Sequence, residues 1–191
     1  MHKREKCCCF TGHRPQKLPW GSDEWDWRCV ALKERILLLI RELYREGYRH
    51  FITGMALGID TYCCEMVLRL KEELTAVKQR CDALETAQFE TLAAQYDGVG
   101  SVLLMQPAME SDAVRRLCDM VAARCCGRCA VFSGEDGAYK YAVIHPGADI
   151  RELIKTMNTA LNGRGGGRDG FAQGSAACTE ADIRSFFGGL N

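Results

Sequence analysis

The sequence predicts an α/β protein in three consecutive parts: a truncated βαβα fragment over residues 1–72, a helical linker over 73–97 and a small α/β module over 98–191. Three observations predict this organisation. Short apolar runs alternate with stretches of helical periodicity in both the first and the last part. Residues 71–95 contain neither proline nor glycine. Gly98 and Gly100 then punctuate the chain, as glycines do between structural elements.

The first part has the order of a parallel βαβ unit. Residues 7–11 (CCCFT) form a short apolar run that predicts a buried strand, and apolar residues at helical spacing predict a helix over 27–46. A second strand is expected over 50–53, followed by a helix that begins at Asp60 or Thr61 and runs towards Leu70. Strands that alternate with helices in this way are typical of a parallel sheet.

The linker predicts a separate amphipathic helix. Leu74, Val77, Cys81 and Leu84 recur at 3-4-3 spacing, which suits a spacer or a short coiled-coil arm. Homodimerisation through residues 73–97 is therefore one hypothesis. Pairing of two copies through the open edge of the small N-terminal sheet is another, because unpaired strand edges attract further strands.

The last part has the order strand–helix–strand–strand–helix, followed by a glycine-rich loop and a short helix. Strands are expected over 101–106, 129–133 and 139–145, and the last two form a hairpin through Gly134 and Gly137. Helices are expected from Ser111, from Asp149 and from Thr179. About ninety residues in this order are enough for a modest core.

Composition limits the classes of function. The formal net charge is zero, so any contact with a polyanion has to be local. The aliphatic run 36–40 is far short of the ~20 residues of a membrane span, so we expect a cytoplasmic protein with no membrane partner. The twelve cysteines, many adjacent, suit buried thiols in a reducing compartment. Cys125, Cys126 and Cys129 have a metal-like spacing without a second half-site, so we expect no metal and no cofactor.

The segment 162–175 (NGRGGGRDGFAQGS) is the strongest local signal for ligand binding. Glycines permit positive φ and close approach, so backbone amides in such a loop can turn inward and form an anion nest. Guanidinium groups fork onto phosphate oxygens, amide side chains reach base edges or 2′-hydroxyls, and an aromatic ring offers a stacking face. The residues expected to contact nucleic acid are Asn162, Arg164, Gly165, Gly166, Gly167, Arg168, Phe171 and Gln173.

The segment LNGRGGGRDGFAQGSA, with CAVFSGEDGAYKYAVIH and DIRELIKTMNTAL before it, resembles the DHH-associated domain of alanyl-tRNA synthetases and alanyl-tRNA editing proteins. The resemblance covers about residues 98–191 and implies a module that contributes to tRNA binding. The zinc-binding HxxxH motif of the editing enzymes is absent from the sequence, and so is the DHH metal motif of related phosphoesterases. We therefore expect a module that is not catalytic by itself.

The segments FTGHRP, LPWG and FITGMALGID resemble the SLOG superfamily, in particular its bacterial FTGHRP-type branch, over residues 7–72. The resemblance implies a Rossmann-like fold with glycine loops that meet a nucleotide, which agrees with loops at strand ends leading into helix N-termini. It implies these contacts: Gly12, Arg14, Thr53, Gly54, Gly58 and Asp60. A structural role for the same glycines, as tight turns, is an equally good interpretation.

Together these features predict a nucleic-acid-binding protein whose partner is tRNA or another structured RNA. Two alternatives stay open. One is a hydrolase related to alanyl-tRNA deacylases, or its remnant, with a metal at Cys125–Cys129. The other is a SLOG-type nucleotide sensor. The meeting of two families near residues 70–72 indicates a gene fusion or a sequence-assembly chimera, and the sequence does not decide between them.

Overall fold

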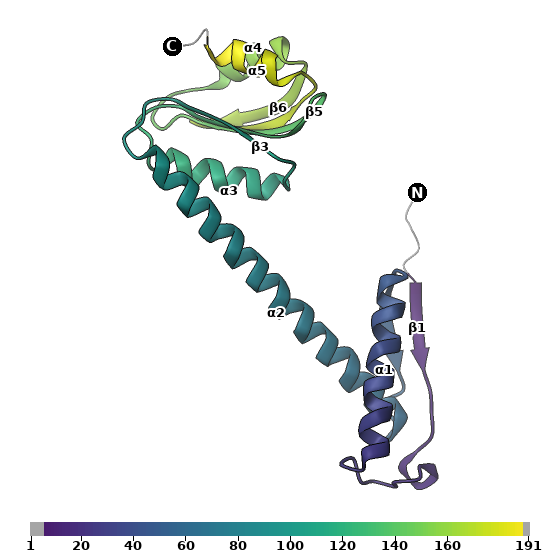
Figure 1. The fold of residues 1–191 in the computed structure, drawn as a ribbon. Helices are drawn as coiled ribbons and strands as arrows, with labels where there is room; N and C mark the ends of the chain where they lie inside the picture. Colours follow the sequence, from purple (N-terminus) through teal and green to yellow (C-terminus); the bar gives the residue numbers. More distant parts are fainter. Residues whose placement is uncertain (1–5, 189–191) are drawn as a thin grey trace. The chain divides into compact units, whose positions relative to one another are not determined.

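The computed structural model describes residues 6–188 and confirms the α/β class. The chain divides into two compact units, Met1–Asp82 and Ala83–Asn191, called unit 1 and unit 2 below. Figure 1 shows the helices and strands of each unit. None of the helices in the described part is long and apolar enough to cross a membrane.

Unit 1 is the βαβα fragment that the sequence predicts. Strands β1 (Lys6–Phe10) and β2 (Tyr48–Thr53) form a two-stranded parallel sheet. A short 3₁₀ turn (Pro15–Lys17) precedes helix α1 (Trp27–Arg45), whose first turn is capped by the side chain of Asp26. Helix α1 and the first turns of α2 pack on one face of the sheet, where Phe10 stacks on Phe51.

The adjacent cysteines are less buried than expected. Cys7 and Cys9 are exposed, whereas Cys29 and Cys63 lie in the core of unit 1. The prediction of buried thiols was therefore wrong for the Cys7–Cys9 run. Its strand has one face without a covering helix in unit 1, so alternate side chains reach the surface.

Helix α2 (Ile59–Ala93) is one continuous helix, where the sequence predicted two in succession. No proline or glycine interrupts it, so the backbone hydrogen bonds continue through residue 71. Ion pairs join it to α1, from Arg41 to Glu73 and from Glu34 to Arg69. Its last turns contribute Phe89 and Ala93 to the core of unit 2, and a 3₁₀ turn (Ala94–Tyr96) follows.

Unit 2 has a five-stranded sheet in the order β3-β4-β5-β7-β6. Its strands are β3 (Val102–Gln106), β4 (Cys129–Glu135), β5 (Ala138–Ile144), β6 (Gly163–Arg168) and β7 (Phe171–Ala176). Only β3 and β4 are parallel, and the other neighbours are antiparallel. The predicted strands and the hairpin between β4 and β5 are confirmed.

Helices cover both faces of this sheet, as Figure 1 shows. Helix α3 (Ser111–Ala122) packs on one face with Leu117, Cys118 and Val121. Helices α4 (Arg151–Ala160) and α5 (Glu180–Gly188) pack on the other, around Phe132 and Tyr141. The predicted capping pair at the start of α5 is confirmed, since the Thr179 backbone N–H donates to Asp182 Oδ2 at 2.9 Å.

Candidate nucleic-acid interface

Residues 163–176 form an antiparallel β-hairpin, with Asp169 and Gly170 in its turn. The prediction of a glycine-rich loop was therefore wrong. At this hairpin, the residues with positive φ are Asn162 (φ 47°) and Gly170 (φ 75°). The four glycines of β6 do not have positive φ: Gly163, Gly165, Gly166 and Gly167. An anion nest needs left-handed residues among right-handed ones, so the glycine run is not a nest.

The glycines allow the hairpin strands to approach closely. A Cβ on Gly167 would lie 2.5 Å from Ala172 Cβ, and a Cβ on Gly165 would lie 2.3 Å from Tyr141 Oη. Opposed Cβ atoms in antiparallel strands normally lie ~4.5–5.5 Å apart. Gly166 differs, since a Cβ there would meet nothing within 4 Å. Packing thus accounts for Gly165 and Gly167 but not for Gly166.

Arg164 and Arg168 lie on the same face of β6, because side chains two and four residues apart on a strand share a face. Their Cα atoms are separated by roughly 13 Å of strand. Across the hairpin, Arg164 pairs with Ser175, Gly166 with Gln173 and Arg168 with Phe171. These six residues are called the hairpin face: Arg164, Gly166, Arg168, Phe171, Gln173 and Ser175.

The hairpin face carries two exposed arginines. The side chains of Arg164, Arg168 and Gln173 are exposed. Among residues 6–188, neither arginine forms an ion pair or a side-chain hydrogen bond. Their guanidinium groups are therefore free to bind an anion without breaking an internal contact.

Phe171 is less available than the sequence suggests. The Arg115 guanidinium of α3 lies 5.5 Å from the centre of its ring, and the ring packs against the core beneath α3. The predicted stacking face is thus partly occupied within the protein. Arg115 also forms an ion pair on its own helix, with its Nε 3.7 Å from Asp119 Oδ2.

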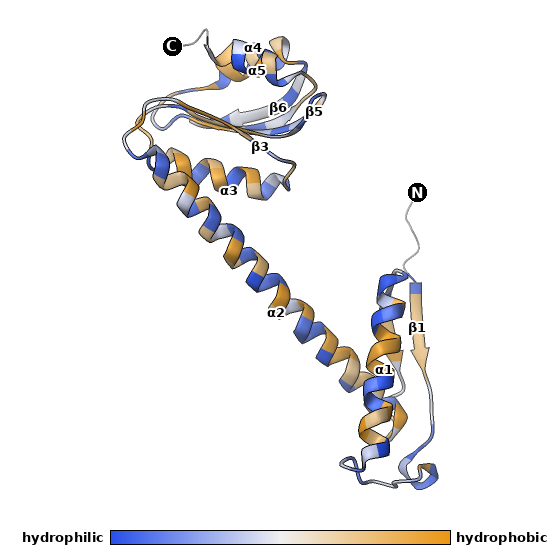
Figure 2. Ribbon diagram, viewed as in Figure 1, coloured by the Kyte–Doolittle hydropathy of each residue, from blue (hydrophilic) through white to orange (hydrophobic). Residues whose placement is uncertain are grey.

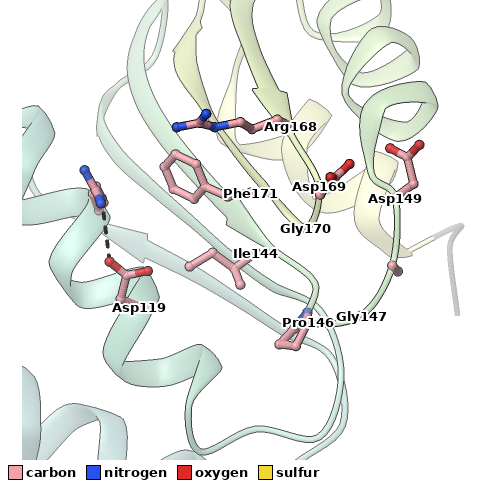
Figure 3. Close-up of a pocket in the computed structure, with 11 residues that line it drawn as sticks. Asp119, Ile144, Pro146, Gly147, Asp149, Arg168, Asp169, Gly170 and Phe171 are labelled. Carbon is pink, nitrogen blue, oxygen red and sulfur yellow. Dashed lines mark ion pairs between the residues drawn. The ribbon is translucent and has the colours of Figure 1, made fainter.

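Figure 3 shows the pocket at this end of the hairpin, about 810 Å³ in volume, with Arg168 and Phe171 in its wall. Three carboxylates, Asp119, Asp149 and Asp169, line it beside Arg115 and Arg168. Arg151 holds the pKa of Asp149 down to about 2, so this carboxylate stays charged at neutral pH. The mixture of charges makes this pocket a poor site for a polyanion.

A second pocket, about 440 Å³, lies between α4 and the outer edge of β6 and is called the edge groove. Its charged residues are Arg151 and Lys155, and Gly165, Gly166 and Gly167 form its other wall. Asn158 anchors the strand there: its Nδ2 donates to the Gly165 carbonyl at 3.0 Å, and its Oδ1 accepts from Tyr141 Oη at 2.8 Å. Lys155 forms no ion pair among the described residues.

The predicted site residues therefore separate into two groups. Gly165 and Gly167 line the edge groove, whereas Arg164, Arg168 and Gln173 lie on the hairpin face. Gly166 borders both. The predicted convergence of backbone amides and both guanidinium groups on one cleft was wrong, because neither Arg164 nor Arg168 lines the edge groove that the glycines form. Asn162 belongs to neither group and follows the C-cap residue of α4 in the left-handed conformation.

Two protein-family models match consecutive parts of the chain. The model of the DHHA1 domain matches residues 97–186, and the model of the YspA SLOG family matches residues 8–91. The two matched regions are called the DHHA1 domain and the SLOG segment below. The SLOG match extends through most of α2, past residue 72, where the resemblance in the motifs ended.

A solved structure also matches: the crystal structure of the C-Ala domain from Aquifex aeolicus alanyl-tRNA synthetase. It is 19% identical in sequence, with a TM-score of 0.41, and the match covers 49% of this chain and 92% of that chain. No curated protein matches the sequence significantly.

Sequence reasoning missed four residues of the DHHA1 domain that surround the hairpin. Arg115 was not singled out, because its contact with Phe171 joins residues far apart in the chain. Arg151, Lys155 and Asn158 lie four and three residues apart on α4, so they share one helix face. That spacing, next to a glycine-rich strand, was a usable signal for the edge groove.

The three candidate metal-binding thiols of the DHHA1 domain lie in different environments. Cys126 is exposed, whereas Cys129 is buried with its Sγ 3.7 Å from Cys118 Sγ. Cys125 Sγ lies 3.5 Å from the Gly127 carbonyl oxygen, and burial raises its pKa. Within residues 6–188, no group of three or more His, Cys, Asp or Glu side chains is arranged to hold a metal ion.

The predicted nucleotide contacts of the SLOG segment lie in the loops after β1 and β2, which touch each other. The Ile59 N–H donates to the His13 carbonyl at 3.2 Å. A Cβ on Gly12 would lie 2.4 Å from Ile59 Cβ, and one on Gly58 (φ 104°) would lie 2.4 Å from the His13 oxygen. Packing between the two loops therefore accounts for both glycines.

The other four candidates are arranged around the same loops. The Thr53 hydroxyl donates to the Asp60 carbonyl at 3.0 Å, and a Cβ on Gly54 would lie 3.1 Å from Asp60 Oδ2. Asp60 is buried at the start of α2, while Arg14 is exposed. Arg14 is thus the candidate whose side chain is available to a ligand.

Proposed function

We propose that the DHHA1 domain binds structured RNA, with tRNA as the first candidate, through the hairpin face and the edge groove. The observation that carries the proposal is that Arg164 and Arg168 are exposed on one face of an edge hairpin, without ion pairs to other described residues. Lys155 adds a further cation on the other side of the same strand. Three cations around one strand suit the spaced phosphates of a folded polynucleotide.

Gln173 supports recognition of RNA in particular. Gln173 lies opposite Gly166 on the hairpin face. Because Gly166 has no side chain, the side-chain amide of Gln173 is accessible. A side-chain amide both donates and accepts hydrogen bonds, so it suits a 2′-hydroxyl or a base edge. The choice of tRNA follows from the sequence resemblance to domains of alanyl-tRNA synthetases and editing proteins.

The test is a double substitution, Arg164→Gln with Arg168→Gln, in the full chain. We expect tRNA affinity to fall roughly tenfold or more, and the slope of log K against log salt concentration to become shallower by about one to two. Fluorescence anisotropy with a labelled tRNA transcript, over a series of salt concentrations, measures both quantities.

The matched control is Arg124→Gln with Arg184→Gln, which removes the same charge from the same unit. Those two arginines are already paired, with Asp97 at 3.1 Å and with Glu180 at 2.6 Å. We expect the control to bind nearly as tightly as the unmodified protein. Equal losses in the two double variants would show that only overall charge matters, and would refute the hairpin as the binding surface.

A second candidate is nucleotide binding by the SLOG segment. It is favoured by the contact between the loops after β1 and β2 at the start of α2, with Arg14 exposed beside them. A nucleotide at a hundredfold excess over its dissociation constant should raise the melting temperature of unit 1 by more than about 5 °C. A thermal-shift screen reads this through tryptophan fluorescence, and Arg14→Ala should abolish the shift; no shift with any nucleotide would contradict it.

A further inference from the structure

Helix α2 carries an apolar stripe that is exposed to solvent in the described part of the chain. Every residue from Leu74 to Leu84 is exposed. Leu74, Val77 and Leu84 are 42%, 57% and 66% exposed, and Cys81 is exposed between them. Figure 2 shows apolar residues recurring along α2 among polar ones. These four residues are called the seam.

The seam has the spacing of a coiled coil. Leu74 and Cys81 occupy one core position of the heptad, and Val77 and Leu84 occupy the other. Three turns of helix are marginally stable in water alone, and an apolar stripe at this spacing gains most from a second helix. We propose that the seam binds the seam of a second copy of this chain, with the two helices parallel and in register.

Charges beside the seam select the parallel arrangement. In a parallel pair, Glu73 of one copy faces Lys78 of the second copy, and Arg80 faces Glu85 of the second copy. Both contacts join opposite charges, and the two-fold axis repeats each of them. Glu73 and Glu85 already pair with Arg41 and Arg116 of their own chain, but both carboxylates remain partly exposed.

The antiparallel arrangement places like charges together. Only one antiparallel register pairs all four seam residues, with Leu74 opposite Leu84 and Val77 opposite Cys81 of the second copy. In that register Lys78 faces Lys78 and Arg80 faces Arg80 across the axis. Like charges at such positions disfavour the antiparallel pairing. Charge complementarity therefore favours the parallel dimer.

The first test is sedimentation equilibrium of the full chain without RNA. Because the seam is short, we expect a dimer whose population rises with protein concentration. Val77→Asp should raise the dimer dissociation constant at least roughly tenfold, whereas Gln79→Asp, on the opposite side of the same exposed helix, should leave it nearly unchanged. A protein that is monomeric at every concentration, or a dimer that tolerates Val77→Asp, would overturn the proposal.

The second test determines orientation and uses Lys78→Glu with Arg80→Glu. In the parallel dimer these substitutions create repulsion, because the new carboxylate at position 78 would face Glu73 and the new carboxylate at position 80 would face Glu85. The antiparallel dimer would merely exchange one pair of like charges for another. Loss of the dimer in this variant is expected, and its persistence would refute the parallel arrangement.

The third test uses Cys81, which faces Cys81 of the second copy only in the parallel dimer. A mild chemical oxidant takes two electrons from the two thiols, which release two protons and form one S–S bond. We expect a covalent dimer in the unmodified chain and in Cys126→Ser, but not in Cys81→Ser. A covalent dimer of equal yield without Cys81 would place the interface elsewhere.

Discussion

Gly167→Ala is expected to destabilise unit 2 by about 2–3 kcal/mol. The added Cβ would lie 2.1 Å from the Phe171 carbonyl oxygen and 2.5 Å from Ala172 Cβ. Both atoms belong to β7, and Ala172 is fully buried, so neither can yield without moving the strand. Strand β6 would have to separate from β7 or lose its register.

The matched control is Gly166→Ala, one residue away on the same strand. Its Cβ meets no atom within 4 Å, and its backbone is extended. We expect the free energy of unfolding to stay the same or to rise by up to about 1 kcal/mol, because alanine restricts the unfolded chain. Two glycines that are indistinguishable in sequence should thus differ clearly in stability.

Urea unfolding followed by far-UV circular dichroism measures this difference. All three tryptophans, Trp20, Trp25 and Trp27, lie in unit 1, so tryptophan fluorescence of the same samples serves as an internal control. Only the transition of unit 2 should shift in Gly167→Ala. If both alanine variants behaved alike, the glycines would lie in a loop, as the sequence first suggested, and the hairpin would be wrong.

The glycine run marks the point where prediction from sequence failed. Strands are recognised by β-branched and aromatic residues in alternation, and GRGGGR contains none. Its strand conformation comes instead from contacts with Ala172, Tyr141 and Asn158, which belong to other elements of the chain. The residues of the site were therefore predicted, but their division between two faces was not.

Elements with local signals were predicted well. The strand over 102–106, the hairpin turn at Gly134–Gly137 and the Thr179–Asp182 cap all depend on neighbouring residues. Contacts such as Arg115 with Phe171, or Cys118 with Cys129, join α3 to strands of the sheet in ways that depend on the folded arrangement. No periodicity in a single sequence specifies such pairs.

The continuity of α2 was not predicted because the surroundings of the helix change along its length. The apolar pattern changes at about residue 71, where the helix leaves the core of unit 1 and its side chains become exposed. The sequence therefore predicted two helices, although no proline or glycine interrupts the helix there. A change of environment along one helix can resemble a boundary between two elements.

Gly58→Ala is expected to destabilise unit 1 by about 2–4 kcal/mol. The φ of Gly58 is 104°, outside the region that L-residues adopt without strain, and an added Cβ would lie 2.4 Å from the His13 carbonyl oxygen. That carbonyl accepts the hydrogen bond from the Ile59 N–H, so the loops after β1 and β2 would separate. Tryptophan fluorescence during urea unfolding follows this transition, because Trp20 packs against the core of unit 1.

Met55→Gly in the same loop is the control. The comparison tests whether Gly58 is required by packing or by a bound ligand. Met55 already has a positive φ of 56° and a side chain that is 58% exposed, so glycine there relieves strain and removes little packing. We expect its free energy of unfolding to change by no more than about 0.5 kcal/mol. A large loss in Gly58→Ala without any nucleotide would show that packing alone requires Gly58. An unchanged transition would mean that the two loops are not in contact, and Gly58 would then need a ligand to explain it.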